Sequence, residues 1–270
     1  MNFIELLLVF MNFIKKIALR FLLFTLFSGF FTSMLSAQMI MERKVDVPKD
    51  AREMVQVIRS RVPVNRIESQ GVLKIRAPKT KVRTVPVVFE VNPLTEDSWE
   101  SVYQATLPEG RQERLLIRSY TSGPNEYILG TKSESDAEWE FKKLAPGEES
   151  AISFAGTDFW LCDLGLEFLS WPEQLFLRRE MRKGRPCRVI QSSPDERLGT
   201  MYARVVSWAD NESDGIVMAQ AYNEFNKRLK EFEVQSFKKV KGVWQLKKMT
   251  IYDNLSDSRT TLEIDLEVSE

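Results

Sequence analysis

Few side chains in this chain could carry out catalytic or metal chemistry. Histidine is absent from all 270 residues, which removes the commonest general base and the commonest metal ligand. Ser-His-Asp catalysis, Cys-His catalysis and zinc sites that use histidine are therefore excluded. The reactive groups that remain are two cysteines and a number of carboxylates.

The two cysteines, Cys162 and Cys187, leave two alternatives open. In an oxidising compartment two cysteines often pair, which predicts a disulfide. Cys162 falls in an apolar helical stretch and Cys187 in a predicted strand, where buried free thiols are common. A catalytic thiol is not expected, because no histidine is available to form the thiolate.

A group of carboxylates lies in a charged stretch over residues 131–149, at Glu138, Glu140, Glu148 and Glu149. A glycosidase needs two carboxylates held about 5 to 10 Å apart across a cleft, and nothing in this stretch singles out such a pair. Charged side chains are mostly exposed, so we interpret the stretch as a solvated loop. The sequence therefore predicts a protein that is not an enzyme, with no cofactor and no metal site.

The N-terminal segment has the pattern of an export signal. Basic residues precede an apolar run over residues 21–31, and small residues follow at Ser36 and Ala37. The run is shorter than the roughly 20 apolar residues that a membrane span needs. We expect residues 1–37 to be a cleaved signal peptide and residues 38–270 to form one domain. Because MNFI occurs at Met1 and again at Met11, residues 1–10 could be a gene-model extension.

The overall charge gives no sign of an anionic partner. The chain carries 38 basic and 38 acidic residues, for a net charge of zero. Such a balance provides no global attraction to nucleic acid or to an anionic membrane. No nucleic-acid partner is expected.

The elements that would position these side chains are mostly short strands. Apolar Val85, Val87, Phe89 and Val91 alternate with the residues between them, which is the pattern of a strand with one buried face. Strands are predicted over residues 67–76, 82–92, 99–107, 113–120, 175–181, 185–191, 201–208, 215–222, 228–238, 243–252 and 260–268. Successive hairpins of this kind build one large antiparallel sheet, here of about ten to eleven strands, which tends to curl.

Two helices are predicted, over residues 49–60 and 158–171. In the second, Leu161, Leu164 and Phe168 recur at helical spacing after the N-cap candidate Asp158, although Gly165 weakens the helix. This segment is either an ordinary core helix or a lid over an apolar cavity. The predicted fold class is mainly β (α+β): a large curled antiparallel sheet, or unclosed β-barrel, with helices covering the concave face.

Several segments resemble the outer-membrane lipoprotein-sorting family related to LolA. They are GTDFWLCDL (156–164), LRREMRKGRPCRVI (177–190), GVWQLKKMTIYD (242–253) and TTLEIDLEV (260–268). The resemblance runs from Ile67 to the end of the chain. It implies an unclosed antiparallel β-barrel with helices as a lid, whose cavity holds acyl chains. Trp160 and Cys162 depart from the more polar pattern of the family.

The resemblance implies a periplasmic carrier that binds acyl chains of lipoproteins or lipids and moves them toward the outer membrane. An inner-membrane transporter and an outer-membrane acceptor are the partners it implies. We assign acyl-chain contact to apolar residues of the strands and the lid: Val87, Phe89, Val91, Leu161, Leu164, Phe168, Phe232 and Val234. The alternative is a non-enzymatic envelope module of the same fold that binds a protein partner and fills its interior with side chains.

Overall fold

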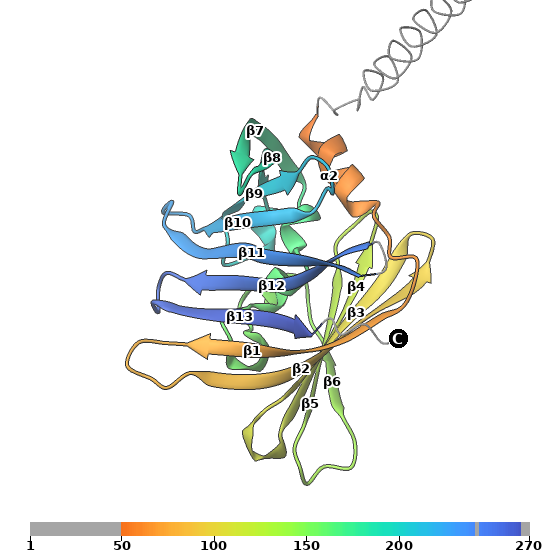
Figure 1. Ribbon diagram of the computed structural model, residues 1–270, viewed down its shortest axis with the longest axis vertical. Coiled ribbons are helices and arrows are strands. Elements are labelled where there is room, and N and C mark those ends of the chain that lie inside the picture. Colours follow the sequence, from red (N-terminus) through yellow and green to blue (C-terminus); the bar gives the residue numbers. More distant parts are fainter. Residues whose placement is uncertain (1–49, 241–242, 266–270) are drawn as a thin grey trace, which may run out of the picture. The chain divides into compact units, whose positions relative to one another are not determined.

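The computed structural model describes residues 50–240 and 243–265, and these residues form one antiparallel sheet of thirteen strands (Figure 1). The predicted signal peptide lies outside the described residues. The strands are β1 (Ile67–Arg76), β2 (Arg83–Thr95), β3 (Ser98–Thr106), β4 (Gln112–Tyr120), β5 (Glu126–Lys132), β6 (Glu140–Lys143), β7 (Glu173–Arg182), β8 (Arg185–Ser193), β9 (Arg204–Asp210), β10 (Ile216–Tyr222), β11 (Arg228–Val240), β12 (Val243–Asp253) and β13 (Ser258–Asp265).

The sheet consists of two meanders joined side by side. Strands β1 to β6 pair in chain order, strands β7 to β13 do the same, and β1 pairs with β13. The register of that junction places Leu73 opposite Leu262. Strands β6 and β7 are the two edges of the sheet and do not pair with each other, so the sheet is not closed. Residues 144–172, which we call the linker, connect these two edges.

The prediction of a large antiparallel sheet is confirmed, but two strands within residues 126–143 were not predicted. β6 is four residues long and fully exposed, and it pairs with β5 through the backbone, with Phe141 opposite Gly130. A short, charged edge strand of this kind resists pairing with other chains, and it has no buried face to mark it in the sequence.

The predicted N-terminal helix is present as α2 (Ala51–Arg59). The Asp50 side chain caps it by accepting a hydrogen bond from the Arg52 N–H at 3.0 Å. The other end is fixed by Arg59, which donates to the carbonyl oxygen of Tyr120 at 2.8 Å. No helix in the described part of the chain is both long and apolar enough to cross a membrane.

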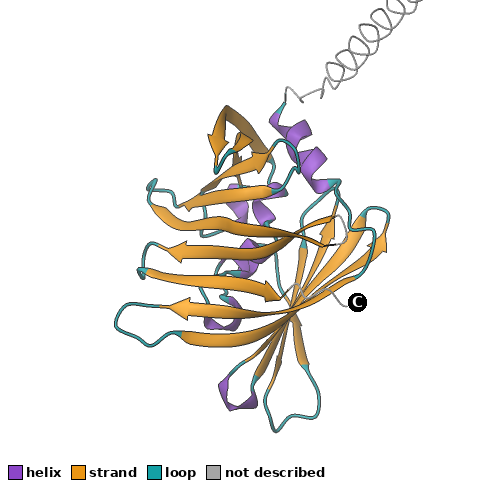
Figure 2. Cartoon of the chain, viewed as in Figure 1, coloured by secondary structure: helices purple, strands orange, loops and turns teal. Residues whose placement is uncertain are grey.

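The predicted helix over residues 158–171 is wrong. The linker instead holds the short helix α3 (Leu161–Leu164) and the 3₁₀ turns η2 (Glu148–Ser150), η3 (Phe154–Gly156) and η4 (Glu167–Leu169) (Figure 2). Leu166 ends the helical path because its backbone is left-handed, with φ 47° and ψ 44°. Gly165 lies so close to Tyr127 that a Cβ atom there would stand 2.2 Å from the tyrosine hydroxyl oxygen.

The main core lies on one face of the sheet, which we call the inner face and which carries Val87, Tyr103, Ile117, Val234 and Ile251. The linker adds Phe154, Phe159 and Leu161 to the same buried cluster. Each of these three side chains is at most 1% exposed. The linker therefore packs against the inner face as part of the hydrophobic core.

A smaller core lies on the opposite face of β8, β9 and β10. Val189, Trp208 and Met218 are in register across these strands, and Cys187 packs with them. Cys162 lies instead in α3, within the linker. Both cysteines are buried as free thiols where the sequence also allowed a disulfide. Cys187 packs on the outer face of the sheet, whereas Cys162 lies in the linker, which covers the inner face.

Candidate functional site

The eight residues predicted to contact acyl chains come together largely where the linker meets the inner face. Val87, Leu161 and Val234 are members of the main core. Phe89, Leu164 and Phe232 are partly buried and pack against it. The remaining two, Val91 and Phe168, are buried outside that cluster.

A small cavity marks the contact between the linker and strands β9 to β12. Its lining residues are Asp163, Leu166, Phe168, Tyr202, Val205, Ala219, Ala221, Lys230, Phe232 and Ile251. The accessible space inside it, about 20 Å³, is enough for about one water molecule and far too small for an acyl chain. In this conformation the interior is filled by the protein's own side chains.

The linker is fastened to the sheet by a polar clamp formed by Asp158, Asp163 and Lys230. The Asp158 carboxylate accepts hydrogen bonds from Ser258 and, at 2.6 Å, from Thr260, both on β13. The Asp158 N–H donates to the Thr260 hydroxyl oxygen at 3.0 Å. One residue of the GTDFWLCDL segment thus satisfies two hydroxyl groups of the inner face.

Lys230 of β11 holds the other half of the clamp. Its ammonium donates to the Asp158 carbonyl oxygen at 2.6 Å and to an Asp163 carboxylate oxygen at 3.3 Å. It also lies 3.6 Å from the centroid of the Trp160 ring, which is a cation–π contact. Because Lys230 is only 2% exposed, these partners must replace the water that its charge has lost.

The Asp163 carboxylate also ties the linker to the segment before β9. The Tyr202 hydroxyl donates to Asp163 at 2.9 Å, and the Trp160 N–H donates to it at 2.8 Å. The rings of Trp160 and Tyr202 stack with their centroids 4.9 Å apart. Burial of Tyr202 and the nearby Asp163 charge both raise the pKa of its hydroxyl, which therefore remains a donor.

A second buried carboxylate, Glu167, anchors the far end of the linker. It accepts hydrogen bonds from the Tyr127 hydroxyl at 2.8 Å and from Ser170. Burial raises the pKa of Glu167, and the negative charge of Glu149 contributes in the same direction. Burial likewise raises the pKa of the Cys162 thiol, so the thiolate needed for nucleophilic chemistry is disfavoured.

These polar groups are engaged in holding the linker rather than directed at a substrate. Among the described residues there is no group of three histidine, cysteine, aspartate or glutamate side chains placed to hold a metal ion.

An open groove of about 1250 Å³ lies beside this clamp. Trp160, Tyr202 and Leu229 form part of its wall, and Met201 and Leu255 lie in the surface loops that line it. The groove is polar as well as apolar along its length. It is therefore better suited as an entrance than as a binding site for an acyl chain.

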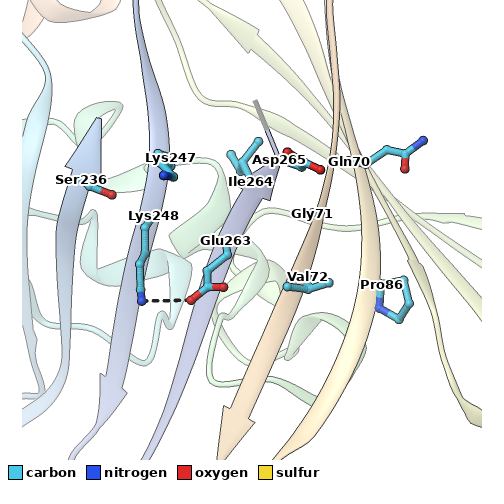
Figure 3. Close-up of a pocket in the computed structure, with 10 residues that line it drawn as sticks. All are labelled: Gln70, Gly71, Val72, Pro86, Ser236, Lys247, Lys248, Glu263, Ile264 and Asp265. Atoms are coloured by element: carbon cyan, nitrogen blue, oxygen red, sulfur yellow. Dashed lines mark ion pairs between the residues drawn. The ribbon is translucent and has the colours of Figure 1, made fainter. Parts of the chain in front are cut away.

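A second hollow, of about 710 Å³, lies near the junction of the two meanders (Figure 3). Lys248 pairs with Glu263 across it at 2.9 Å. Gly71 is required there, because a Cβ atom would stand 2.5 Å from the carbonyl oxygen of Glu263 on the paired strand. This hollow is open and partly charged, and it does not reach the core residues predicted to bind a ligand.

Sequence reasoning missed Lys230, Tyr202 and Leu166 as residues of the site. Lys230 had a usable signal, because it shares the alternation of Phe232 and Val234 and must therefore point to the same face. Tyr202 and Leu166 carried no such signal. Tyr202 fell in a predicted strand over residues 201–208 that begins only at Arg204 in the structure, and Leu166 adopts a backbone conformation that leucine rarely takes.

Comparison with solved structures identifies the fold. A DUF1329 family protein from Desulfovibrio piger aligns with TM-score 0.66 and 19% identity, over 81% of this chain and 92% of that one. A putative outer membrane lipoprotein-sorting protein domain from Vibrio parahaemolyticus aligns with TM-score 0.63 and 18% identity, over 80% and 90%. A LolA superfamily protein from Nitrosomonas europaea aligns with TM-score 0.58 and 14% identity, over 83% and 95%. The chain has a LolA-like fold.

Sequence comparisons add less. A family model described as "Uncharacterized protein" matches residues 138–268. A comparison with curated proteins found no match. The fold is therefore established by structural likeness, and the function has to be argued from the site.

Replacing Asp163 with alanine tests the clamp. The variant leaves the Lys230 ammonium buried without its charged partner, which costs about 3–5 kcal/mol of unfolding free energy. Glu68→Ala is the matched control, because it removes an exposed ion pair with Arg66 and should cost at most about 1 kcal/mol. Chemical denaturation measures both. Equal losses in the two variants would show that the clamp does not hold the linker.

Replacing Glu167 with glutamine tests the buried carboxylate by its pH dependence. A raised pKa in the folded state means that the folded protein binds more protons than the unfolded chain, so stability falls as pH rises from about 4.3 through the raised pKa. Glutamine can still accept from Tyr127 and has no charge to bury. The unfolding free energy of the wild type should fall relative to Glu167→Gln between pH 4 and pH 7 in denaturant titrations. A constant difference would contradict the assignment.

Proposed function

We propose that this protein is a non-enzymatic carrier that binds acyl chains of lipoproteins or lipids between the linker and the inner face of the sheet. It would act in the periplasm, as one domain over residues 38–270 behind a cleaved signal peptide, and move its cargo toward the outer membrane. The LolA-like fold and the apolar inner face support this proposal. The similarity to the Vibrio parahaemolyticus protein, a putative lipoprotein-sorting domain, supports it as well.

The observation that carries the proposal is the position of Leu166, which lines the small cavity together with Phe168. We interpret Leu166 as a plug over Ala219 and Ala221, which present little volume from β10. Leu166 holds a left-handed backbone conformation that a leucine adopts at a cost of about 1–3 kcal/mol. Displacing the plug would relieve this strain and leave space over small side chains.

The binding energy would come from burial alone. Each acyl methylene removed from water contributes about 0.8 kcal/mol, so one or more acyl chains can offset the loss of the plug's own contacts. In the proposed open state, Phe168 and Phe232 contact the cargo first, because both line the cavity. Val87, Phe89, Val91, Leu161, Leu164 and Val234 extend the apolar surface beyond it.

Release requires a competitor for the acyl chains. Strong apolar burial has no chemical trigger of its own, so a partner protein or a membrane must take over the buried surface. An inner-membrane transporter for loading and an outer-membrane acceptor for delivery would fill these two roles. In this scheme the clamp sets how much free energy opening requires.

The filled interior favours a second candidate function, an envelope module that binds a protein partner and carries no lipid. A cavity of about 20 Å³ is what such a module would show permanently. The two candidates differ in whether the linker gives way to an acyl ligand. Uptake of a soluble acyl probe distinguishes them.

Replacing Phe168 with glutamate should abolish uptake of a fluorescent fatty acid by the purified protein, because it places a carboxylate against the proposed acyl path. Phe232→Gln is the second variant, since its side chain is only partly buried and the fold should tolerate the change. Leu175→Glu on β7 is the control, because Leu175 is already exposed. Fatty-acid uptake by this variant should match that of the wild type. Fluorescence titration measures uptake, and thermal unfolding reports whether each variant is folded. Undiminished uptake by a folded Phe168→Glu or Phe232→Gln variant would contradict the proposed path.

A further inference from the structure

Four loops lie side by side at one end of the sheet, and we call them together the rim. They are the β1–β2 turn (77–82), the β12–β13 turn (254–257), the β10–β11 turn (223–227) and the β8–β9 loop (194–203). The register brings them to the same end, with Arg76 opposite Arg259 and Lys230 opposite Asp253. Figure 1 shows three of these turns along its left edge.

Each of these neighbouring loops exposes a large apolar side chain. The exposed fractions are 50% for Val82, 57% for Leu255, 80% for Phe225 and 51% for Met201. Single exposed apolar residues are common on protein surfaces, but here each of four adjacent loops carries one. These four side chains, which we call the apolar tips, belong to neither core cluster, so packing of the core does not require them.

Basic side chains accompany the tips. Residues 76–83 contain four basic residues and no acidic one: Arg76, Lys79, Lys81 and Arg83. Lys79, Lys81 and, in the β10–β11 turn, Lys227 are exposed and have no acidic partner among the described side chains. Because the exposed acids of the rim lie in its other loops, at Glu196, Glu224 and Asp257, positive charge is concentrated at the β1–β2 turn.

We propose that the rim docks on a membrane surface that contains anionic phospholipids. The apolar tips would enter the boundary between headgroups and acyl chains, while Lys79 and Lys81 lie at the level of the phosphates. The positive charge of the β1–β2 turn, which carries Lys79 and Lys81 and no acidic residue, argues for this occupant. Lysine is depleted at protein–protein interfaces, whereas lysines beside apolar side chains are typical of surfaces that bind anionic lipid.

Docking in this orientation would place the open groove against the membrane. Met201 and Leu255 belong both to the rim and to the groove that leads to Trp160 and Tyr202. An acyl chain leaving the bilayer would therefore enter beside the clamp without crossing bulk water. This last step rests on the proposed carrier function, whereas docking itself does not.

Vesicle co-sedimentation of the exported protein, which lacks the proposed signal peptide, tests the proposal. The wild type should bind vesicles of phosphatidylcholine and phosphatidylglycerol more strongly than vesicles of phosphatidylcholine alone. Phe225→Ser with Leu255→Ser should lower the partition coefficient about tenfold or more, because two apolar tips no longer enter the interface. Lys79→Gln with Lys81→Gln should lower binding to the anionic vesicles by about fivefold per lysine and leave binding to the neutral vesicles unchanged.

Val64→Ser with Leu94→Ser is the matched control, because both side chains are exposed apolar residues outside the rim. This double variant should bind vesicles as the wild type does. A wild type that ignores both kinds of vesicle, or a Phe225/Leu255 variant that binds as well as the wild type, would overturn docking on lipid. Fatty-acid uptake in solution, measured on the same variants, separates the two proposals: lost docking with intact uptake would leave the carrier function standing.

Discussion

The rest of the structure depends on one constraint: an open sheet with an apolar inner face must be covered, and the linker between its two edge strands supplies cover. Strands β6 and β7 lie at opposite edges, and the chain that joins them packs against the inner face. There it adds aromatic side chains to the core. Closure of the interior is thus a consequence of strand order and does not need a closed barrel.

The way in which the linker is held distinguishes this cover from an ordinary core segment. Its residues Phe154, Phe159 and Leu161 are fully buried. Its position is also fixed by hydrogen bonds and an ion pair among Asp158, Asp163, Lys230 and the hydroxyl groups of β13. Polar contacts of this kind are directional, and they lose their strength quickly once the groups separate or water enters. Together with the strained backbone at Leu166, they describe a cover that is specific in position.

The sheet and most of its strands could be predicted because alternation in segments such as β2 reports a buried face directly. The short helical turns of the linker could not. The spacing of Leu161, Leu164 and Phe168 fits a helix, but the close approach of Gly165 to Tyr127 and the left-handed Leu166 are set by tertiary contacts. For Lys230, alternation along β11 predicts that the side chain points to the inner face. Its partners could not be predicted, because they come from a segment about 70 residues away along the chain.

Native mass spectrometry of the protein purified from the envelope of its own host, followed by solvent extraction of bound material, tests the central claim most directly. A carrier should retain lipid or acylated protein in stoichiometric amount, and extraction would identify the cargo. A protein that appears only at its bare mass and also refuses added acyl ligands would contradict the account, and would leave a LolA-like module whose interior is permanently filled.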